Sequence, residues 1–177
     1  MGRLKVLFCA YRDWGKDIHQ YSNHYIKEEM NDLLDENGMD LCTSQKSLDQ
    51  LDTSKYDLLF FIGWSEIIPN KLISKKNCIC LHPSKLPQYR GGSPIQNQII
   101  DGVKESAITF FVMDEGLDTG DILHQIPLSL EGDLKDIFSR IINSSYYVIA
   151  NIIYDLKLKG TLNSIPQKKT LKPKKRR

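Results

Sequence analysis

The strongest indication of the fold is the apolar run Y-D-L-L-F-F-I-G, from Tyr56 to Gly63. A strand with one face in water alternates apolar and polar side chains, but this run is apolar throughout after Asp57. Uninterrupted runs of this kind are typical of strands that are buried on both faces in a parallel sheet. We therefore predict that residues 56–63 form a central strand.

Strand-like and helix-like segments alternate along the rest of the chain. Residues 4–10 predict a first buried strand, and apolar side chains between Ile18 and Leu34 lie near helical spacing. Asn37-Gly38 supplies a C-terminal stop for that helix. This alternation predicts a Rossmann-like, three-layer α/β fold with a mostly parallel sheet. The other predicted segments are a loop at 11–15, strands at 39–43, 78–81, 107–113 and 122–130 (the last an antiparallel edge strand), a loop or weak helix at 44–55, short helices from Pro69 and around 95–100, and a long helix from Asp133 to Gly160.

The charge of the chain is unevenly distributed. At 177 residues the chain fits one domain, which we assign to residues 1–165. Residues 168–177 contain seven of the 24 basic residues and no acid, which leaves 17 basic against 22 acidic residues, a net of −5, in residues 1–167. A terminal block of like charges is usually solvated, so we predict a flexible basic tail at 166–177, with contact to nucleic acid or phosphate as the alternative.

The composition is that of a soluble globular protein, with 41% apolar and 26% charged residues. No apolar run approaches the roughly 20 residues that a membrane-spanning helix needs, and the first run ends at Tyr11 without the small-residue pattern of a signal peptide. The four cysteines predict buried free thiols, because Cys78 and Cys80 lie on one face of one strand, a poor geometry for a disulfide. Free thiols predict a reducing compartment and hence a cytoplasmic location.

Two side chains with useful chemistry follow predicted strands. His82 comes directly after the strand at 78–81, and Asp118 lies in the loop M-D-E-G-L-D-T-G-D after the strand at 107–113. Ligands of α/β sheets bind beyond the carboxyl ends of the strands, where residues 63–65 also lie. We therefore predict that His82 and Asp118 form the working centre of the protein.

Several familiar motifs are absent from the sequence. It has no G-x-G-x-x-G after the first strand and no G-x-x-x-x-G-K-[ST], which excludes the usual nucleotide-binding loops. It has no G-x-S-x-G either, and Ser84 lies in the proline-bounded loop 83–94, where we expect it to cap backbone groups. A metal site would need His82, Asp118 and a third ligand such as Cys80, and we predict none.

Two motifs together resemble the signature of the folate-dependent formyltransferases. The family includes methionyl-tRNA formyltransferase, glycinamide ribonucleotide transformylase and the N-formyltransferases of amino-sugar nucleotides. The segment F-F-I-G-W-S-E-I-I-P at 60–69 resembles the strand and turn that receive the pterin in this family. The residues that carry the resemblance are His82-Pro83-Ser84, Leu86-Pro87, Tyr89-Arg90-Gly91, Pro94, Gly102, Thr109 and Leu117-Asp118-Thr119-Gly120 with Ile122.

The resemblance implies a formyltransferase fold and an enzyme that transfers a formyl group from 10-formyltetrahydrofolate to a primary amine. His82 would donate a hydrogen bond to the formyl oxygen as negative charge grows there, and Asp118 would accept the proton of the attacking amine while orienting His82. Without the resemblance, His82 is interpreted as a loop cap and Asp118 as an Asx turn. The implied folate-binding residues are Ile62, Gly63, Trp64, Ser65, Ile67, Asp114, Glu115 and Gly116, and the implied acceptor-binding residues are Ser84, Tyr89, Arg90 and Gly91.

One position departs from the family pattern. The family has N-x-H, with an asparagine that donates to the formyl oxygen, and Cys80 stands in its place here. A thiol is a weak donor, and losing an oxyanion donor costs on the order of 10²–10³ in rate. Either backbone N–H groups or water replace the amide, or the enzyme is slow, or the chain is a folate-binding or regulatory member of the family with little turnover.

Motifs that the sequence lacks narrow the class of molecule that could accept the formyl group. The segment Y-R-D-W-G-K at 11–16 lacks the glycine-rich phosphate-binding pattern of the ribonucleotide transformylase. The chain also ends before the further domain of the tRNA enzyme, either naturally or because it is cut near its P-Q element at 166–167. We therefore expect a nucleotide-linked amino sugar as the small-molecule partner. Nucleic acid is a less favoured partner, no membrane contact is expected, and a homodimer is left open.

Overall fold

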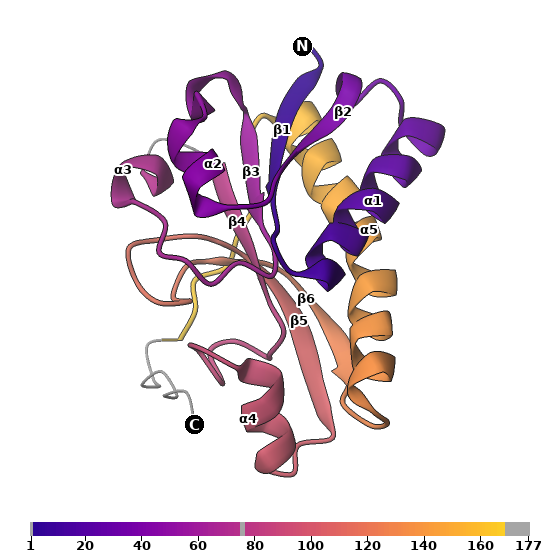
Figure 1. The fold of residues 1–177 in the computed structure, drawn as a ribbon, viewed down its shortest axis with the longest axis vertical. Helices are drawn as coiled ribbons and strands as arrows, with labels where there is room; N and C mark the ends of the chain where they lie inside the picture. Colours follow the sequence, from indigo (N-terminus) through magenta and orange to yellow (C-terminus); the bar gives the residue numbers. More distant parts are fainter. Residues whose placement is uncertain (1, 75–76, 169–177) are drawn as a thin grey trace.

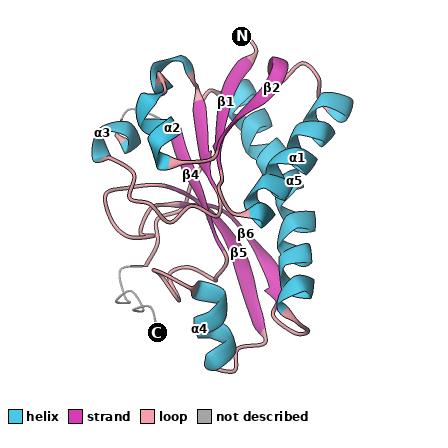
Figure 2. Cartoon of the chain, viewed as in Figure 1, coloured by secondary structure: helices cyan, strands magenta, loops and turns pink. Residues whose placement is uncertain are grey.

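The computed structural model describes residues 2–74 and 77–168, and strands of this part form one mixed sheet (Figure 1). Its strands are β1 (Leu4–Cys9), β2 (Leu34–Cys42), β3 (Leu58–Phe61), β4 (Asn77–His82), β5 (Glu105–Val112) and β6 (Ile122–Ser129). Their order across the sheet is β2-β1-β3-β4-β5-β6, and helices cover both faces (Figure 2). The predicted Rossmann-like α/β fold is confirmed.

Two long helices cover one face of the sheet and pack against each other (Figure 1). They are α1 (Asp13–Glu29) and α5 (Leu134–Lys159). As predicted, α5 follows an N-cap at Asp133, whose side chain accepts from the Asp136 N–H, and it closes at Gly160 with a φ of 69°. The other helical segments are α2 (Gln45–Gln50), the 3₁₀ turn η1 (Thr53–Lys55), α3 (Asn70–Ile73) and α4 (Pro94–Ile100), which confirm the weak helix at 44–55 and the short helices near Pro69 and at 95–100.

The central position predicted for β3 is confirmed, since this strand lies between β1 and β4. All four of its side chains are at most 1% exposed. Leu58 and Phe60 pack into the cluster under α1 and α5, whereas Leu59 and Phe61 pack into the smaller cluster on the opposite face. Burial on both faces explains why the run carries no polar alternation.

The direction of β5 was not predicted. Strands β2, β1, β3 and β4 are parallel, but β5 is antiparallel to both β4 and the edge strand β6. The carboxyl end of β5 therefore lies beside the amino end of β4, where the Met113 N–H donates to the Cys78 carbonyl at 2.8 Å. The loop that follows β5 starts at the end of the sheet opposite His82.

The predicted first helix is displaced. Helix α1 begins at Asp13, inside the predicted loop at 11–15, and it ends at Glu29 rather than near Leu34. The Met30 N–H closes the last turn on the Ile26 carbonyl at 2.9 Å. The predicted helix boundaries were therefore wrong at both ends.

The second strand is longer than the predicted segment at 39–43. It begins at Leu34, which pairs with Leu4 in the sheet instead of continuing the helix. The predicted stop, Asn37-Gly38, lies inside β2 at an irregularity of the β1–β2 register, and its glycine has a φ of 78°. This bulge is held from α1, because the Met39 N–H donates to Asn23 Oδ1 at 3.0 Å.

The segment after α5 runs back to the start of β6. Ile122 and Ile165 exchange two backbone hydrogen bonds of 2.8 Å, and Gln167 bonds to the domain, two residues past the boundary predicted at 165. The basic residues at 169–177 lie outside the described residues, and the flexibility of this tail stays a prediction. No helix in the described part of the chain is long and apolar enough to cross a membrane.

Candidate active site

Buried polar side chains hold the loop between β4 and α4. Thr109 on β5, which pairs with His82, donates from Oγ1 to the Ser84 carbonyl at 2.6 Å. The Ser84 hydroxyl donates to the Gln88 carbonyl at 2.7 Å, and Ser84 is fully buried. Ser84 therefore caps the loop, as its position predicted, and it has no exposed surface for the implied contact with an acceptor.

Gln98 on α4 is a second buried support, which the sequence analysis missed. Its Nε2 donates to the Pro83 carbonyl at 2.9 Å and to the Pro94 carbonyl at 3.0 Å, so one amide joins the two ends of the loop. Its Oε1 accepts from the Ser106 hydroxyl. The signal that could have revealed it was a pair of amide side chains, Asn97 and Gln98, within the short helix predicted around 95–100, and both are buried.

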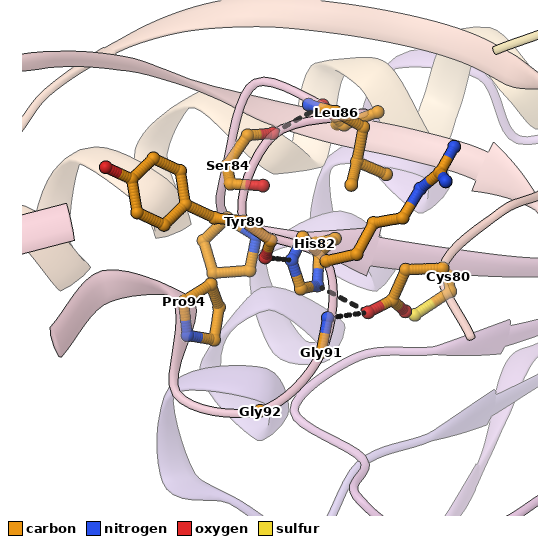
Figure 3. Close-up of polar contacts among 12 residues, drawn as sticks. Cys80, His82, Ser84, Leu86, Tyr89, Gly91, Gly92 and Pro94 are labelled. Carbon is orange, nitrogen blue, oxygen red and sulfur yellow. Dashed lines mark hydrogen bonds and ion pairs between the residues drawn. The ribbon is translucent and has the colours of Figure 1, made fainter. Parts of the chain in front are cut away.

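His82 is the last residue of β4, and its ring is almost completely buried. Nε2 lies 2.8 Å from the Tyr89 carbonyl oxygen. Because a carbonyl oxygen only accepts, this nitrogen carries the hydrogen. Nδ1 faces the Asp118 carboxylate, with 3.5 Å between Nδ1 and Oδ2 (Figure 3).

Asp118 lies in the loop between β5 and β6, and its backbone has a φ of 53°. Its Oδ2 accepts from the Gly91 N–H at 2.8 Å, so the carboxylate is tied to the loop that follows His82 (Figure 3). Within the Asp118 loop, Asp114 Oδ1 accepts from the Gly116 N–H at 3.1 Å and from the Thr119 hydroxyl at 2.6 Å. The structure thus brings together the histidine and the carboxylate that the sequence predicted.

Cys80 lies two residues before His82 on the same face of β4. Its Sγ donates to the Leu81 carbonyl at 3.6 Å. Burial, and secondly the negative charge of Asp118, raise the pKa of the Cys80 thiol well above its ordinary value. The thiol therefore stays protonated near neutral pH, so it is poorly suited to nucleophilic attack.

The implied acceptor-binding residues follow in the same loop. Tyr89 has a φ of 57°, and its hydroxyl donates to Asp101 Oδ2 at 3.0 Å. Arg90 is 7% exposed, and its Nε and Nη2 donate to Gln167 Oε1 at 3.2 and 2.6 Å. The N–H of Gly91 is engaged by Asp118. Gln167 was not among the predicted site residues, and its place in the P-Q element was the only signal for it.

The turn after β3 carries the implied folate-binding residues. Ile62 is fully buried in the core and its N–H donates to the Cys9 carbonyl at 3.0 Å, so it has no exposed surface for a ligand. Trp64 stacks edge-on against Tyr11, with 5.4 Å between the ring centroids, and its Nε1 is buried without a hydrogen-bond partner among the described residues. The Ser65 hydroxyl is bonded to that of Tyr11, and the side chain of Ile67 is 90% exposed.

The other implied folate-binding residues, Asp114, Glu115 and Gly116, are exposed. Met113, which precedes them, packs against the same cluster of buried side chains as Trp64. The turn after β3 and the start of the Asp118 loop therefore border one face of the sheet. An indole ring, a thioether and exposed backbone groups suit a flat heterocycle with polar edges, which the pterin of a folate is.

An α/β sheet with a histidine and a carboxylate meeting across two loops defines a class of site, and comparison with known proteins identifies the family. Residues 21–144, more than half of the chain, match the family model described as "Formyl transferase". The chain belongs to the formyl transferase family.

Curated relatives agree with this assignment. The methionyl-tRNA formyltransferase of Halalkalibacterium halodurans is 39% identical over 127 residues, which are 70% of this chain and 40% of the relative. The methionyl-tRNA formyltransferase of Lachnospira eligens is 33% identical over 124 residues, which are 68% of this chain and 39% of the relative. The chain thus spans about two fifths of the length of these relatives.

Solved structures share the fold. The methionyl-tRNA formyltransferase from Clostridium thermocellum superimposes with a TM-score of 0.77 and 26% identity, covering 98% of this chain and 73% of that one. The formyltransferase PseJ from Anoxybacillus kamchatkensis, in complex with a UDP-linked formamido sugar and tetrahydrofolate, gives a TM-score of 0.66 and 20% identity, covering 96% of this chain and 85% of that one. At that identity the second likeness concerns the fold alone.

Proposed function

We propose that this chain transfers a formyl group from 10-formyltetrahydrofolate to a primary amine. The supporting observation is that His82 Nδ1 and Asp118 Oδ2 lie 3.5 Å apart in a member of the formyl transferase family. An amine that attacks a formyl carbon places negative charge on the oxygen and positive charge on the nitrogen. The reaction therefore needs a hydrogen-bond donor and a proton acceptor side by side.

The two side chains divide these tasks. The Tyr89 carbonyl engages Nε2–H of His82, so we assign the formyl oxygen to Nδ1–H of the imidazolium form, in which both ring nitrogens carry a hydrogen. Asp118, held by the Gly91 N–H, accepts the proton of the amine directly or through a water. In the balanced reaction the acceptor nitrogen bonds to the formyl carbon, the bond from that carbon to folate N10 breaks, the amine loses one proton and N10 gains one.

For the donor, we propose that the folate binds at the turn after β3 and beside Asp114, Glu115 and Gly116. The unpartnered Nε1 of Trp64 supports this placement, because a buried donor without a partner costs free energy that a ligand acceptor would recover. When bound, 10-formyltetrahydrofolate supplies the formyl group. The contribution of the chain is to orient that group against His82 and to exclude water from it.

For the acceptor, we propose a nucleotide-linked amino sugar that binds near Tyr89, Arg90 and Gly91. Residues 11–16 lack a glycine-rich phosphate loop, which argues against the ribonucleotide substrate. A second candidate is methionyl-tRNA, because the relatives quoted above, at 33% and 39% identity, bear the name methionyl-tRNA formyltransferase. Both acceptors present a primary amine, so the chemistry at His82 and Asp118 is the same.

The test is direct transfer to each acceptor class. The protein is incubated with 10-formyltetrahydrofolate and, in turn, with nucleotide-linked 3-amino and 4-amino deoxysugars and methionyl-tRNA, and the formylated product is measured by mass spectrometry. We expect transfer to one class and a loss of about 10²-fold or more in His82→Ala, with His24→Ala, an exposed histidine of α1, as the matched control. The proposal would be overturned if the protein bound the folate but formylated none of these amines, and if His82→Ala bound the folate as well as the wild type does.

An alternative function is favoured by Cys80. Because a thiol replaces the expected amide donor, the chain would be a folate-binding or regulatory member of the family with little turnover. Comparing wild type with Cys80→Asn separates the two functions. A gain of about 10²–10³ from near zero in Cys80→Asn would support the binding module, whereas substantial wild-type turnover that changes little would support the enzyme.

A further inference from the structure

Gln167 makes four hydrogen bonds with a single side chain. Its Oε1 accepts from Nε and Nη2 of Arg90 at 3.2 and 2.6 Å. Its Nε2 donates to the carbonyls of Asp118 at 3.1 Å and Gly120 at 2.7 Å. An amide has two donor hydrogens and an oxygen with two lone pairs, so these contacts use its full capacity.

The two segments that Gln167 joins are those that place the catalytic pair. Arg90 directly follows Tyr89, whose carbonyl accepts from His82 Nε2 at 2.8 Å. Asp118 carries the carboxylate that faces His82 Nδ1. Gln167 therefore links the side chain of Arg90, next to the carbonyl that orients the histidine, to the backbone that carries the carboxylate.

Both segments need such support. Tyr89 and Asp118 have φ values of 57° and 53°, in the left-handed region that residues other than glycine rarely occupy. Conformations of this kind persist only where surrounding contacts hold them. Gln167 contacts the carbonyl of Asp118 itself and the guanidinium of Arg90, the residue after Tyr89, so it can restrain both strained segments.

Gln167 is itself held in place by the sheet. It comes two residues after Ile165, which exchanges backbone hydrogen bonds of 2.8 Å in both directions with Ile122 at the start of β6. Gln167 Nε2 then reaches the loop that precedes β6. The segment after α5 is thus anchored on the sheet before it reaches the site.

We propose that Gln167 is a positioning residue that sets the distance between Asp118 and His82. It does so by donating to the Asp118 and Gly120 carbonyls while it accepts from Arg90. Its effect on rate rests on the proposed formyl transfer, but its effect on the geometry does not. The segment after α5 is therefore part of the active site.

The test uses two variants and a readout that needs no activity. Gln167→Met removes all four hydrogen bonds at similar volume, whereas Gln167→Glu keeps the acceptor for Arg90 and loses both donations to carbonyls. The readout is amide hydrogen exchange by NMR at Gly91, whose N–H is protected by the Asp118 carboxylate, and at Ile122, whose N–H reports docking of the segment. Asn163→Ala, an exposed change in the same segment, is the matched control.

We expect exchange at Gly91 to accelerate about tenfold or more in both variants, with exchange at Ile122 unchanged in Gln167→Glu. In the transfer assay we expect kcat to fall roughly 10–100-fold with folate affinity unchanged, because misplacement of a catalytic group costs rate rather than donor binding. Unchanged exchange at Gly91 in both variants would overturn the proposal. Equal acceleration at Gly91 and Ile122 in Gln167→Glu would also overturn it, since the segment would then only have detached. If the wild type transfers no formyl group, the proposed function fails and the exchange data still decide the role of Gln167.

Discussion

Replacing Asp118 by Asn is the sharpest probe of the candidate site, because it removes a charge while keeping the shape of the side chain. Asp118 Oδ2 accepts from the Gly91 N–H at 2.8 Å and lies 3.5 Å from His82 Nδ1. An amide oxygen can still accept from Gly91, so the loop should keep its position. The variant loses the capacity to take a proton from the attacking amine.

The expected magnitudes differ strongly between rate and stability. A positioned general base contributes roughly 10²–10⁴ in rate, which corresponds to about 3–5 kcal/mol of activation free energy at 1.36 kcal/mol for each factor of ten. The hydrogen bond from Gly91 changes from a charged to a neutral acceptor, which costs about 1 kcal/mol in the free energy of unfolding. Asp118→Asn should therefore be folded and nearly inactive.

The assay compares transfer rates and urea unfolding for wild type, Asp118→Asn and the control Asp121→Asn, an exposed carboxylate of the same loop. Asp121→Asn should retain the wild-type rate. If Asp118→Asn also retained the wild-type kcat, while His82→Ala lost it, proton acceptance by Asp118 would be refuted.

A second readout of Asp118→Asn is the thiol of Cys80. Burial is the larger cause of its raised pKa, and the Asp118 charge is the smaller one. Removing the charge lowers the pKa of this thiol but leaves it above its ordinary value, so more thiolate is present at a given alkaline pH. Alkylation of Cys80 by iodoacetamide, followed by peptide mass spectrometry, should be faster in the variant. An unchanged or slower rate would contradict the electrostatic contact between the two side chains.

Three further changes test the scaffold through urea unfolding. Thr109→Val removes the 2.6 Å donor to the buried Ser84 carbonyl, which keeps the Leu86 N–H at 3.0 Å, and should cost about 0.5–1.5 kcal/mol, the net contribution of one hydrogen bond; a cost near zero would show that the loop re-forms its bonds. Gly120→Ala places a methyl group onto the Val112 carbonyl oxygen, which should cost about 1–3 kcal/mol and open the turn between β5 and β6; unchanged stability would contradict the close approach. Burial lowers the pKa of His19, so the unfolded chain binds more protons than the folded one below about pH 6.5, and the free energy of unfolding should fall with acidification. In His19→Gln this fall between pH 7 and 5 should be smaller than in the wild type. An equal fall would show that His19 does not cause the pH dependence.

Local pattern was sufficient for the elements whose burial is uniform. The apolar run at 56–63 predicted the central strand because a strand covered on both faces shows no alternation. Asp133 and Gly160 predicted the ends of α5 because capping is decided by neighbouring residues. In both cases the residues that determine the structure belong to the element itself or directly adjoin it.

Local sequence pattern gave wrong boundaries for α1 and β2, because contacts between residues far apart in the sequence decide where these elements begin and end. Leu34 fits the helical spacing of α1 equally well, but its place in β2 is set by pairing with Leu4, thirty residues earlier. Asn37-Gly38 resembles a helix stop, yet it forms a bulge that Asn23 stabilises from α1 through the Met39 N–H. Neither contact can be predicted from the spacing of apolar residues within the segment.

The structure places the two predicted side chains, His82 and Asp118, side by side, but the chain reaches this arrangement by a route that was not predicted. His82 and Asp118 were expected to meet because both follow strands of a parallel sheet. Since β5 is antiparallel to β4, its carboxyl end lies beside Cys78, at the far end of the strand from His82. The loop after β5 has to fold back along the sheet, and what returns Asp118 to His82 is the pair of anchors at Gly91 and Gln167.

This route bears on the missing amide at position 80. The Cys80 thiol donates to the Leu81 carbonyl, and His82 Nε2–H is taken by the Tyr89 carbonyl, so neither is directed at a substrate. In the imidazolium form, Nδ1–H of His82 is then the donor that is left for a formyl oxygen. The position of Nδ1 relative to Asp118 therefore matters more for the rate than it would if an asparagine amide at position 80 also donated to that oxygen. A site in which His82 alone donates to the formyl oxygen should tolerate less displacement of Asp118. The contacts that hold the loop between β5 and β6 should therefore affect the rate as strongly as the histidine itself does.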